Sequence, residues 1–101
     1  MKYKIFYPTG FQVKDILNDN IDINIIFENG DTYFATLFTI KNVEYLMKTA
    51  TNEIEKKYFW ATDMIIVKDL MEKTINETIE HIINAYNFKD YFTLIKKEVD
   101  F

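Results

Sequence analysis

The clearest pattern in the chain is a pair of apolar segments on either side of Asn29-Gly30. Ile21–Glu28 is rich in Ile, and Asp31–Ile40 is rich in Thr, Phe and Tyr. Two such segments joined by Asn-Gly predict a β-hairpin with a type I′ turn, because Asn and Gly adopt the positive φ that this turn needs. A two-residue loop makes Glu28 the predicted partner of Asp31.

This predicted pairing assigns alternate residues to the two faces of the hairpin. One face is expected to form the core, with Ile21, Ile23, Ile25, Phe27, Phe34 and Phe38. The other face mixes polar and apolar positions: Asp22, Asn24, Ile26, Glu28, Asp31, Tyr33, Ala35 and Leu37. Unless a helix covers it, the mixed face is available to a partner.

The remaining periodicities predict one more strand on each side of the hairpin and three helices. The expected elements are a strand at Lys2–Tyr7, a helix at Ile40–Ala50 capped by Thr39, a strand at Tyr58–Val67, a helix that starts at an Asp69/Glu72 capping box and runs to about Asn87, and a helix at Phe88–Lys97. The order β-β-β-α-β-α-α predicts one α+β domain over residues 1–101. It would have an antiparallel or mixed sheet of about four strands and about three helices.

Composition fits this single globular domain. The chain has 101 residues, of which 49% are hydrophobic and 28% charged. It has no Cys, which excludes disulfides and thiolate chemistry. We expect a cytoplasmic protein without a membrane segment, because no apolar run is long enough for a signal peptide or a span.

The charge pattern argues against nucleic-acid binding. The formal net charge is −4, and all twelve cationic residues are Lys. Arg, which supplies the bidentate contacts to guanine and phosphate, is absent. Mild acidity is compatible with a basic protein partner.

Catalytic side chains are sparse. The chain has neither Cys nor Ser as a nucleophile, and its one His, His81, is predicted on the polar side of a helix. Glu77 and His81 are four residues apart, which gives at most half a metal site. Gly10 and Gly30 stand alone, so no phosphate-binding loop is predicted. We therefore expect a non-enzymatic protein with no metal and no cofactor.

Two features of the predicted strand Tyr58–Val67 have more than one interpretation. Asp63 interrupts the apolar face of this strand. It is expected at a solvated or bulged position, or in a hydrogen bond to a neighbouring loop. The alternative is that its carboxylate is placed for recognition of a partner. Tyr58 and Trp60 are expected to pack in the core, with interface anchoring as the alternative.

Two segments resemble a group of small uncharacterised bacterial proteins that are thought to be immunity proteins of toxin–immunity systems, such as polymorphic toxins and contact-dependent inhibition. They are Glu28–Thr39 (ENGDTYFATLFT) and Lys57–Val67 (KYFWATDMIIV). The resemblance implies a cytosolic protein that binds and neutralises a cognate toxin without a cofactor.

The sequence thus predicts a protein that occludes a toxin, for example a nuclease, through an acidic and aromatic surface. The candidate partner-binding residues are Asp22, Asn24, Glu28, Asp31, Tyr33 and Asp63. Two alternatives stay open: a phage-encoded inhibitor of a host nuclease defence, and a homodimeric module that pairs through Ile26, Tyr33 and Leu37.

Overall fold

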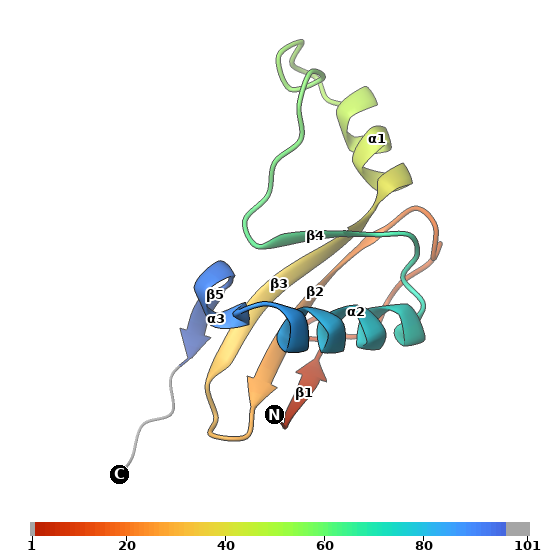
Figure 1. Cartoon of the computed structure of the whole chain (residues 1–101). Helices are drawn as coiled ribbons and strands as arrows, with labels where there is room; N and C mark the ends of the chain where they lie inside the picture. Colours follow the sequence, from red (N-terminus) through yellow and green to blue (C-terminus); the bar gives the residue numbers. More distant parts are fainter. Residues whose placement is uncertain (1, 97–101) are drawn as a thin grey trace.

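A computed structural model describes residues 2–96 as a mixed five-stranded sheet with three helices (Figure 1). The strands are β1 (Tyr3–Phe6), β2 (Asn20–Phe27), β3 (Thr32–Thr39), β4 (Met64–Val67) and β5 (Thr93–Lys96). The helices are α1 (Ile40–Lys48), α2 (Glu72–Ala85) and α3 (Phe88–Tyr91). The predicted α+β class is confirmed, and a fifth strand follows the predicted order.

Strand β3 is the centre of the sheet. One of its edges pairs antiparallel with β2, which in turn pairs with β1. Its other edge is divided between two short strands: Thr36–Thr39 pairs parallel with β4, and Thr32–Phe34 pairs antiparallel with β5. Two segments that are far apart in the sequence therefore meet end to end along one strand.

The predicted hairpin forms, but its register is wrong by one residue. The N–H of Phe27 donates to the carbonyl of Asp31 at 2.9 Å, and the N–H of Gly30 donates to the carbonyl of Phe27 at 2.8 Å. The loop therefore has three residues. Of the two residues in Asn29-Gly30, only Gly30 has positive φ, at 94°. This geometry is typical of a type I turn followed by a left-handed bulge residue, which competes with the two-residue type I′ turn.

The register shift inverts the predicted faces of β3. Ile25 faces Tyr33 and Ile23 faces Ala35, so the residues that share the core face of the hairpin are Ile21, Ile23, Ile25, Phe27, Tyr33, Ala35 and Leu37. Helix α2 contributes Ile75 and Ile79 to this core, and α3 contributes Phe88. Both helices lie on this side of the sheet (Figure 1). The opposite side, here called the second sheet face, carries Phe6, Asp22, Asn24, Ile26, Phe34, Thr36, Phe38 and Ile66.

The predicted strand Tyr58–Val67 is shorter in the structure, because Asp63 adopts a left-handed φ of 54° that ends the extended backbone on its N-terminal side. The predicted helix Phe88–Lys97 is also shorter. It ends at Tyr91, and the chain then adds β5 to the edge of β3 that β4 leaves unpaired. Lys97, the last residue of that prediction, lies outside the described residues.

Helix α1 begins at its predicted cap. The Thr39 hydroxyl accepts the N–H of Asn42 at 3.2 Å. Helix α2 begins three residues after Asp69, whose carboxylate accepts the N–H of Met71 at 3.0 Å in the turn before the helix. Within residues 2–96, none of the helices combines the length and apolar character that a membrane span requires.

Candidate functional site

The two candidate polar residues of β2, Asp22 and Asn24, lie on the second sheet face. Asp22 accepts a hydrogen bond from the hydroxyl of its cross-strand partner Thr36 at 2.8 Å. Asn24 lies one pair further along the same face and is partly exposed. Asp22 therefore supports the sheet through Thr36, in addition to any role at the surface.

The predicted acidic pair beside the turn is separated from Asp22 by most of a strand. Glu28 is exposed. The Asp31 carboxylate accepts a hydrogen bond from the Asn29 side-chain amide at 3.3 Å, and the Asp31 N–H donates to the oxygen of the same amide at 3.0 Å. Asp22 and Glu28 are six positions apart along the strand, which corresponds to about 20 Å. The structure thus places the candidate acids at opposite ends of the hairpin.

Tyr33 does not lie on an outer face. It is only 5% exposed and packs edge-on against Phe27 and Phe88, with ring centroids 5.6 and 5.7 Å apart. Burial, and then the nearby charge of Asp31, raise the pKa of its phenol. The prediction that Tyr33 offers surface to a partner is wrong, because the hairpin register turns it into the core. The predicted dimer face loses Tyr33 and Leu37 for the same reason.

Asp63 lies at the junction of β4 and β5. Its carbonyl accepts the N–H of Thr36, and its carboxylate Oδ1 accepts the N–H of Thr93 at 3.1 Å. The other carboxylate oxygen is buried and has no hydrogen-bond partner. The sequence predicted a hydrogen bond to a neighbouring loop; the partner is instead Thr93, the first residue of β5, and Asp63 joins the two short strands.

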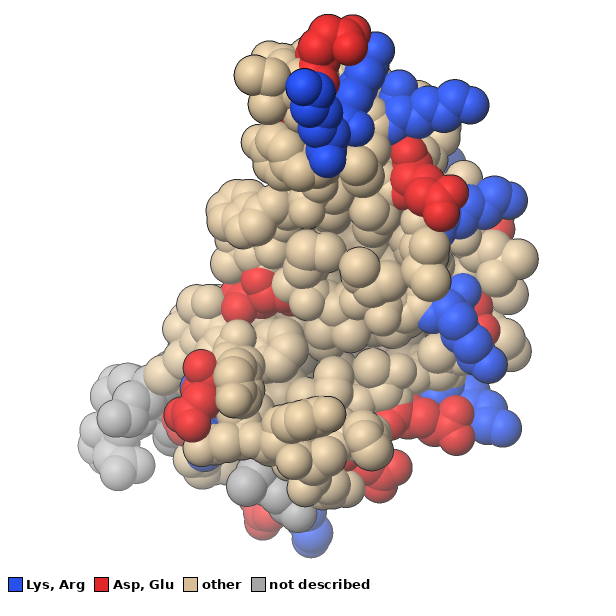
Figure 2. All heavy atoms as spheres, turned by 45° about the horizontal axis from the view of Figure 1, so that its top comes forward, with Lys and Arg blue, Asp and Glu red and all other residues tan. Residues whose placement is uncertain are grey.

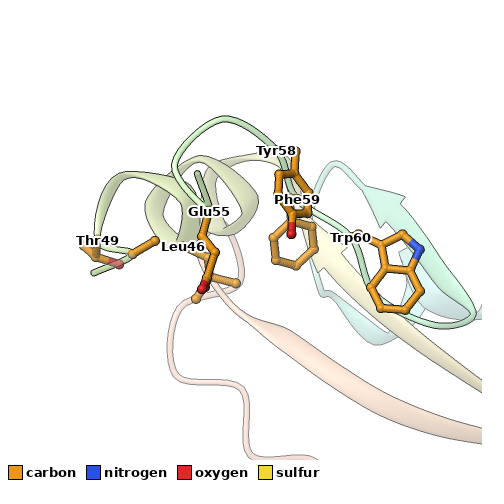
Figure 3. A pocket seen from close by; sticks show the side chains of 7 residues that line it. Leu46, Thr49, Glu55, Tyr58, Phe59 and Trp60 are labelled. Atoms are coloured by element: carbon orange, nitrogen blue, oxygen red, sulfur yellow. The ribbon is translucent and has the colours of Figure 1, made fainter. Parts of the chain in front are cut away.

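A groove beside α1 is lined by aromatic side chains, among them Tyr58 and Trp60, which were predicted to pack in the core. It has a volume of about 430 Å³ and is lined by Leu46, Thr49, Ala50, Glu55, Tyr58, Phe59 and Trp60 (Figure 3). We call it the aromatic groove. Trp60 is 75% exposed and Tyr58 is 56% exposed. Phe59 packs edge-on against Phe38 with ring centroids 4.9 Å apart, so the groove adjoins the second sheet face.

The groove belongs to a part of the chain that buries almost nothing. Between Ile40 and Asp63, here called the α1 lobe, Asn42 is the one buried residue. Its side chain bonds to Asn18 in the loop before β2 and to Asn20, the first residue of β2, which fixes the start of α1 to this end of the strand. A lobe that is anchored by a polar network and keeps its apolar side chains half-exposed is suited to contact another molecule.

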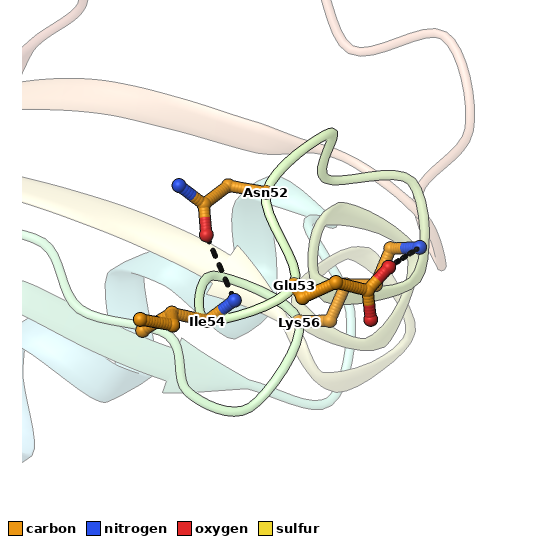
Figure 4. A network of polar contacts seen from close by, with 4 residues as sticks. All are labelled: Asn52, Glu53, Ile54 and Lys56. Carbon is orange, nitrogen blue, oxygen red and sulfur yellow. Dashed lines mark hydrogen bonds and ion pairs between the residues drawn. The ribbon is translucent and has the colours of Figure 1, made fainter.

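Local hydrogen bonds order the loop that carries Glu55. The Asn52 side chain accepts the N–H of Ile54 at 2.8 Å, and Lys56 pairs with Glu53 at 3.2 Å (Figure 4). The N–H of Lys57 donates to the carbonyl of Ile54 at 3.0 Å. These contacts close a turn at the mouth of the groove and place Glu55 beside Leu46 (Figure 3).

Most charged side chains of this region lie toward its edges, and Glu55 is the one charged residue that lines the groove itself. The α1 lobe has four Lys and four acidic residues. Figure 2, in which the end that carries α1 is tilted forward, shows lysine and acidic side chains mainly along the upper and right-hand edges. The broad central area is largely free of charged side chains, apart from an acidic patch at its left. A centre with few charges and a polar rim is the usual anatomy of a protein–protein interface.

Titratable groups elsewhere do not form a cluster that could hold a metal ion, as far as residues 2–96 show. His81 is exposed on α2, and its ring lies edge-on to Tyr86 at 6.5 Å. Asp63, by contrast, contacts Thr36 and Thr93 of the sheet.

No protein-family model, curated protein or solved structure matches this chain. The choice of the aromatic groove as the candidate site therefore depends on its geometry alone. Its one signal in the sequence is the run Tyr58-Phe59-Trp60, whose alternating side chains favoured a half-buried strand. That interpretation fails because the strand begins only at Met64.

Proposed function

We propose that this protein is a non-enzymatic binding protein that neutralises a cognate bacterial toxin by docking on it through the aromatic groove. The observation that carries the proposal is the exposure of Trp60 and Tyr58 at the rim of a groove of about 430 Å³. Trp and Tyr are the side chains most enriched at the energetic centres of interfaces, because they bury large areas with few rotatable bonds.

The toxin as partner comes from the resemblance of Glu28–Thr39 and Lys57–Val67 to candidate immunity proteins. The second of these segments contains the groove residues Tyr58, Phe59 and Trp60. The net charge of −4 favours a basic partner through long-range attraction.

The test uses the product of the gene that lies directly upstream in the native genome. Induction of that gene alone should stop growth of a laboratory host, and co-expression of this protein should restore it. Purified toxin should bind the wild type and should bind Trp60→Ala at least about tenfold more weakly, since anchoring aromatic residues contribute more than 1 kcal/mol. Continued growth arrest in the presence of well-folded wild-type protein would reject the proposal.

A homodimeric module is the second candidate, because the second sheet face exposes part of its apolar side chains. Phe6 and Ile66 are each 51% exposed there, and Ile26 is partly exposed. This set replaces the face predicted from the sequence. Light scattering of the purified protein separates the two candidates: a stable dimer that Ile26→Glu dissociates supports the module, and a monomer at high micromolar concentration removes it.

A further inference from the structure

We propose that the aromatic groove is a cation site, which takes a Lys or Arg side chain from a protein partner between Glu55 and the rings of Tyr58 and Trp60. The inference rests on the proposed function, since it names the chemistry of the partner that the groove receives. It concerns one acidic side chain that the sequence did not single out.

Glu55 is the one charged residue among the seven that line the groove. Its side chain is exposed, and within residues 2–96 its carboxylate makes neither a hydrogen bond nor an ion pair. The nearest acid in sequence, Glu53, is already paired with Lys56. Glu55 is therefore the carboxylate of this loop that is left for an incoming cation.

The rings add to the attraction. The face of an aromatic ring is electron-rich, and a Lys or Arg side chain over Trp or Tyr is stabilised in addition to its ion pair. Figure 3 shows Glu55 near Leu46 on the α1 side of the groove, with Tyr58 and Phe59 across from it and the Trp60 ring furthest away. A long basic side chain can lay its methylene groups along Leu46 and Phe59 while its charged end meets Glu55.

The charge of Glu55 determines which kind of ligand the groove favours. A carboxylate beside three rings disfavours an acidic or phosphate-bearing ligand, and a purely apolar ligand would leave Glu55 to be desolvated without a partner. The net charge of −4 acts in the same direction at longer range. A basic protein segment satisfies both conditions.

The experiment titrates the full chain with three ten-residue peptides, one rich in Lys and Arg, one rich in Glu, and one of Gly and Ser. Trp60 is the only tryptophan, so its fluorescence reports directly on the groove. We expect the basic peptide alone to shift and protect the Trp60 emission. Glu55→Gln should weaken this binding about fivefold or more.

The matched control is Glu77→Gln on the exposed side of α2, which changes the net charge by the same amount. It should change the affinity less than twofold. Equal losses in the two variants would show attraction to net charge alone, and overturn the cation site. Trp60→Ala, followed by calorimetry, should also weaken binding; unchanged affinity would have the same consequence.

Two further outcomes decide the relation to the proposed function. If the toxin is neutralised equally by the wild type and Glu55→Gln, the proposed function stands and the cation site is wrong. If the basic peptide binds through Glu55 but the wild type does not neutralise the toxin, the cation site stands and the proposed function is wrong. A groove that light scattering and Trp60 emission show to be filled by a second copy of the chain overturns the site.

Discussion

The carboxylate of Asp63 accepts the backbone N–H of Thr93 at 3.1 Å, and this contact joins two strands that share one edge of β3. Asp63 precedes β4, and Thr93 begins β5. The residue reaches this position with a φ of 54°, which Asp and Asn tolerate better than most residues. One side chain therefore links the start of the parallel strand β4 to the start of the antiparallel strand β5.

Substitutions at Asp63 should separate its backbone role from its charge. Asp63→Asn keeps an acceptor and the tolerated φ, and removes the charge from the buried oxygen that has no partner. We expect its free energy of unfolding to stay within about 0.5 kcal/mol of the wild type. Asp63→Val loses the acceptor and places a β-branched residue at positive φ, so it should cost about 2 kcal/mol or more.

Urea denaturation of the two variants measures the difference. A loss in Asp63→Asn as large as that in Asp63→Val would contradict this explanation, because it would show that the negative charge itself is needed.

The Thr39 hydroxyl should contribute more to stability than its methyl group. It accepts the N–H groups of Asn42 at 3.2 Å and Asp19 at 3.3 Å, and the residue is fully buried. Thr39→Val keeps the shape and leaves both donors without this acceptor, which should cost about 1–2 kcal/mol. Thr39→Ser keeps the hydroxyl and serves as the matched control. If thermal or chemical denaturation shows Ser to be the more damaging change, the capping role assigned to Thr39 is wrong.

Asp69 should give the protein an acid-sensitive contribution to stability. The hydroxyl of Thr74 and the backbone N–H of Met71 lower the pKa of its carboxyl. A carboxyl whose pKa is lower in the folded state stabilises the fold above its unfolded pKa, and this contribution is lost as the pH falls through the folded pKa. Urea midpoints at pH 7 and in steps below pH 5 should therefore fall more for the wild type than for Asp69→Asn. Parallel curves for the two proteins would contradict this assignment.

The class of fold could be predicted from the sequence because periodicity and turn residues identify the elements one by one. The hairpin was found from Asn29-Gly30, and α1 from its cap at Thr39. The register of the hairpin could not be predicted. Asn29-Gly30 fits a two-residue type I′ turn, and it fits equally a three-residue loop in which Gly30 is left-handed. That single step moved Tyr33 from the predicted surface into the core.

Strand β5 and the aromatic groove could not be predicted, because both depend on tertiary contacts. Helical spacing is seen at Phe88, Tyr91, Phe92 and Ile95. Thr93–Lys96 nevertheless forms a strand, because β4 covers only part of the edge of β3 and leaves Thr32–Phe34 to pair with β5. Tyr58 and Trp60 alternate like a strand, yet they leave the sheet because Asp63 turns the chain before Met64. Local propensity was overridden in both segments.

The acids beside the hairpin turn should affect the rate of association rather than the lifetime of a complex. Thr32 and Phe38, at the two ends of the intervening strand, are six residues apart, so the turn lies about 20 Å from the Phe59 contact. Reversal of Glu28 to Lys should slow association with a basic toxin a few-fold and reduce its salt dependence, with the dissociation rate unchanged. Surface plasmon resonance at two salt concentrations measures both rates. A large change in the dissociation rate would move the interface to the hairpin.

The affinity of the purified toxin for Trp60→Ala, compared with Tyr91→Ala, tests the central proposal most directly. Tyr91 is 70% exposed on α3, outside the aromatic groove, so both substitutions remove a ring that is mostly exposed. The docking proposal predicts a loss of about 30-fold for Trp60→Ala, typical of an interface anchor, and less than about twofold for Tyr91→Ala. Equal affinity of Trp60→Ala and the wild type would contradict it.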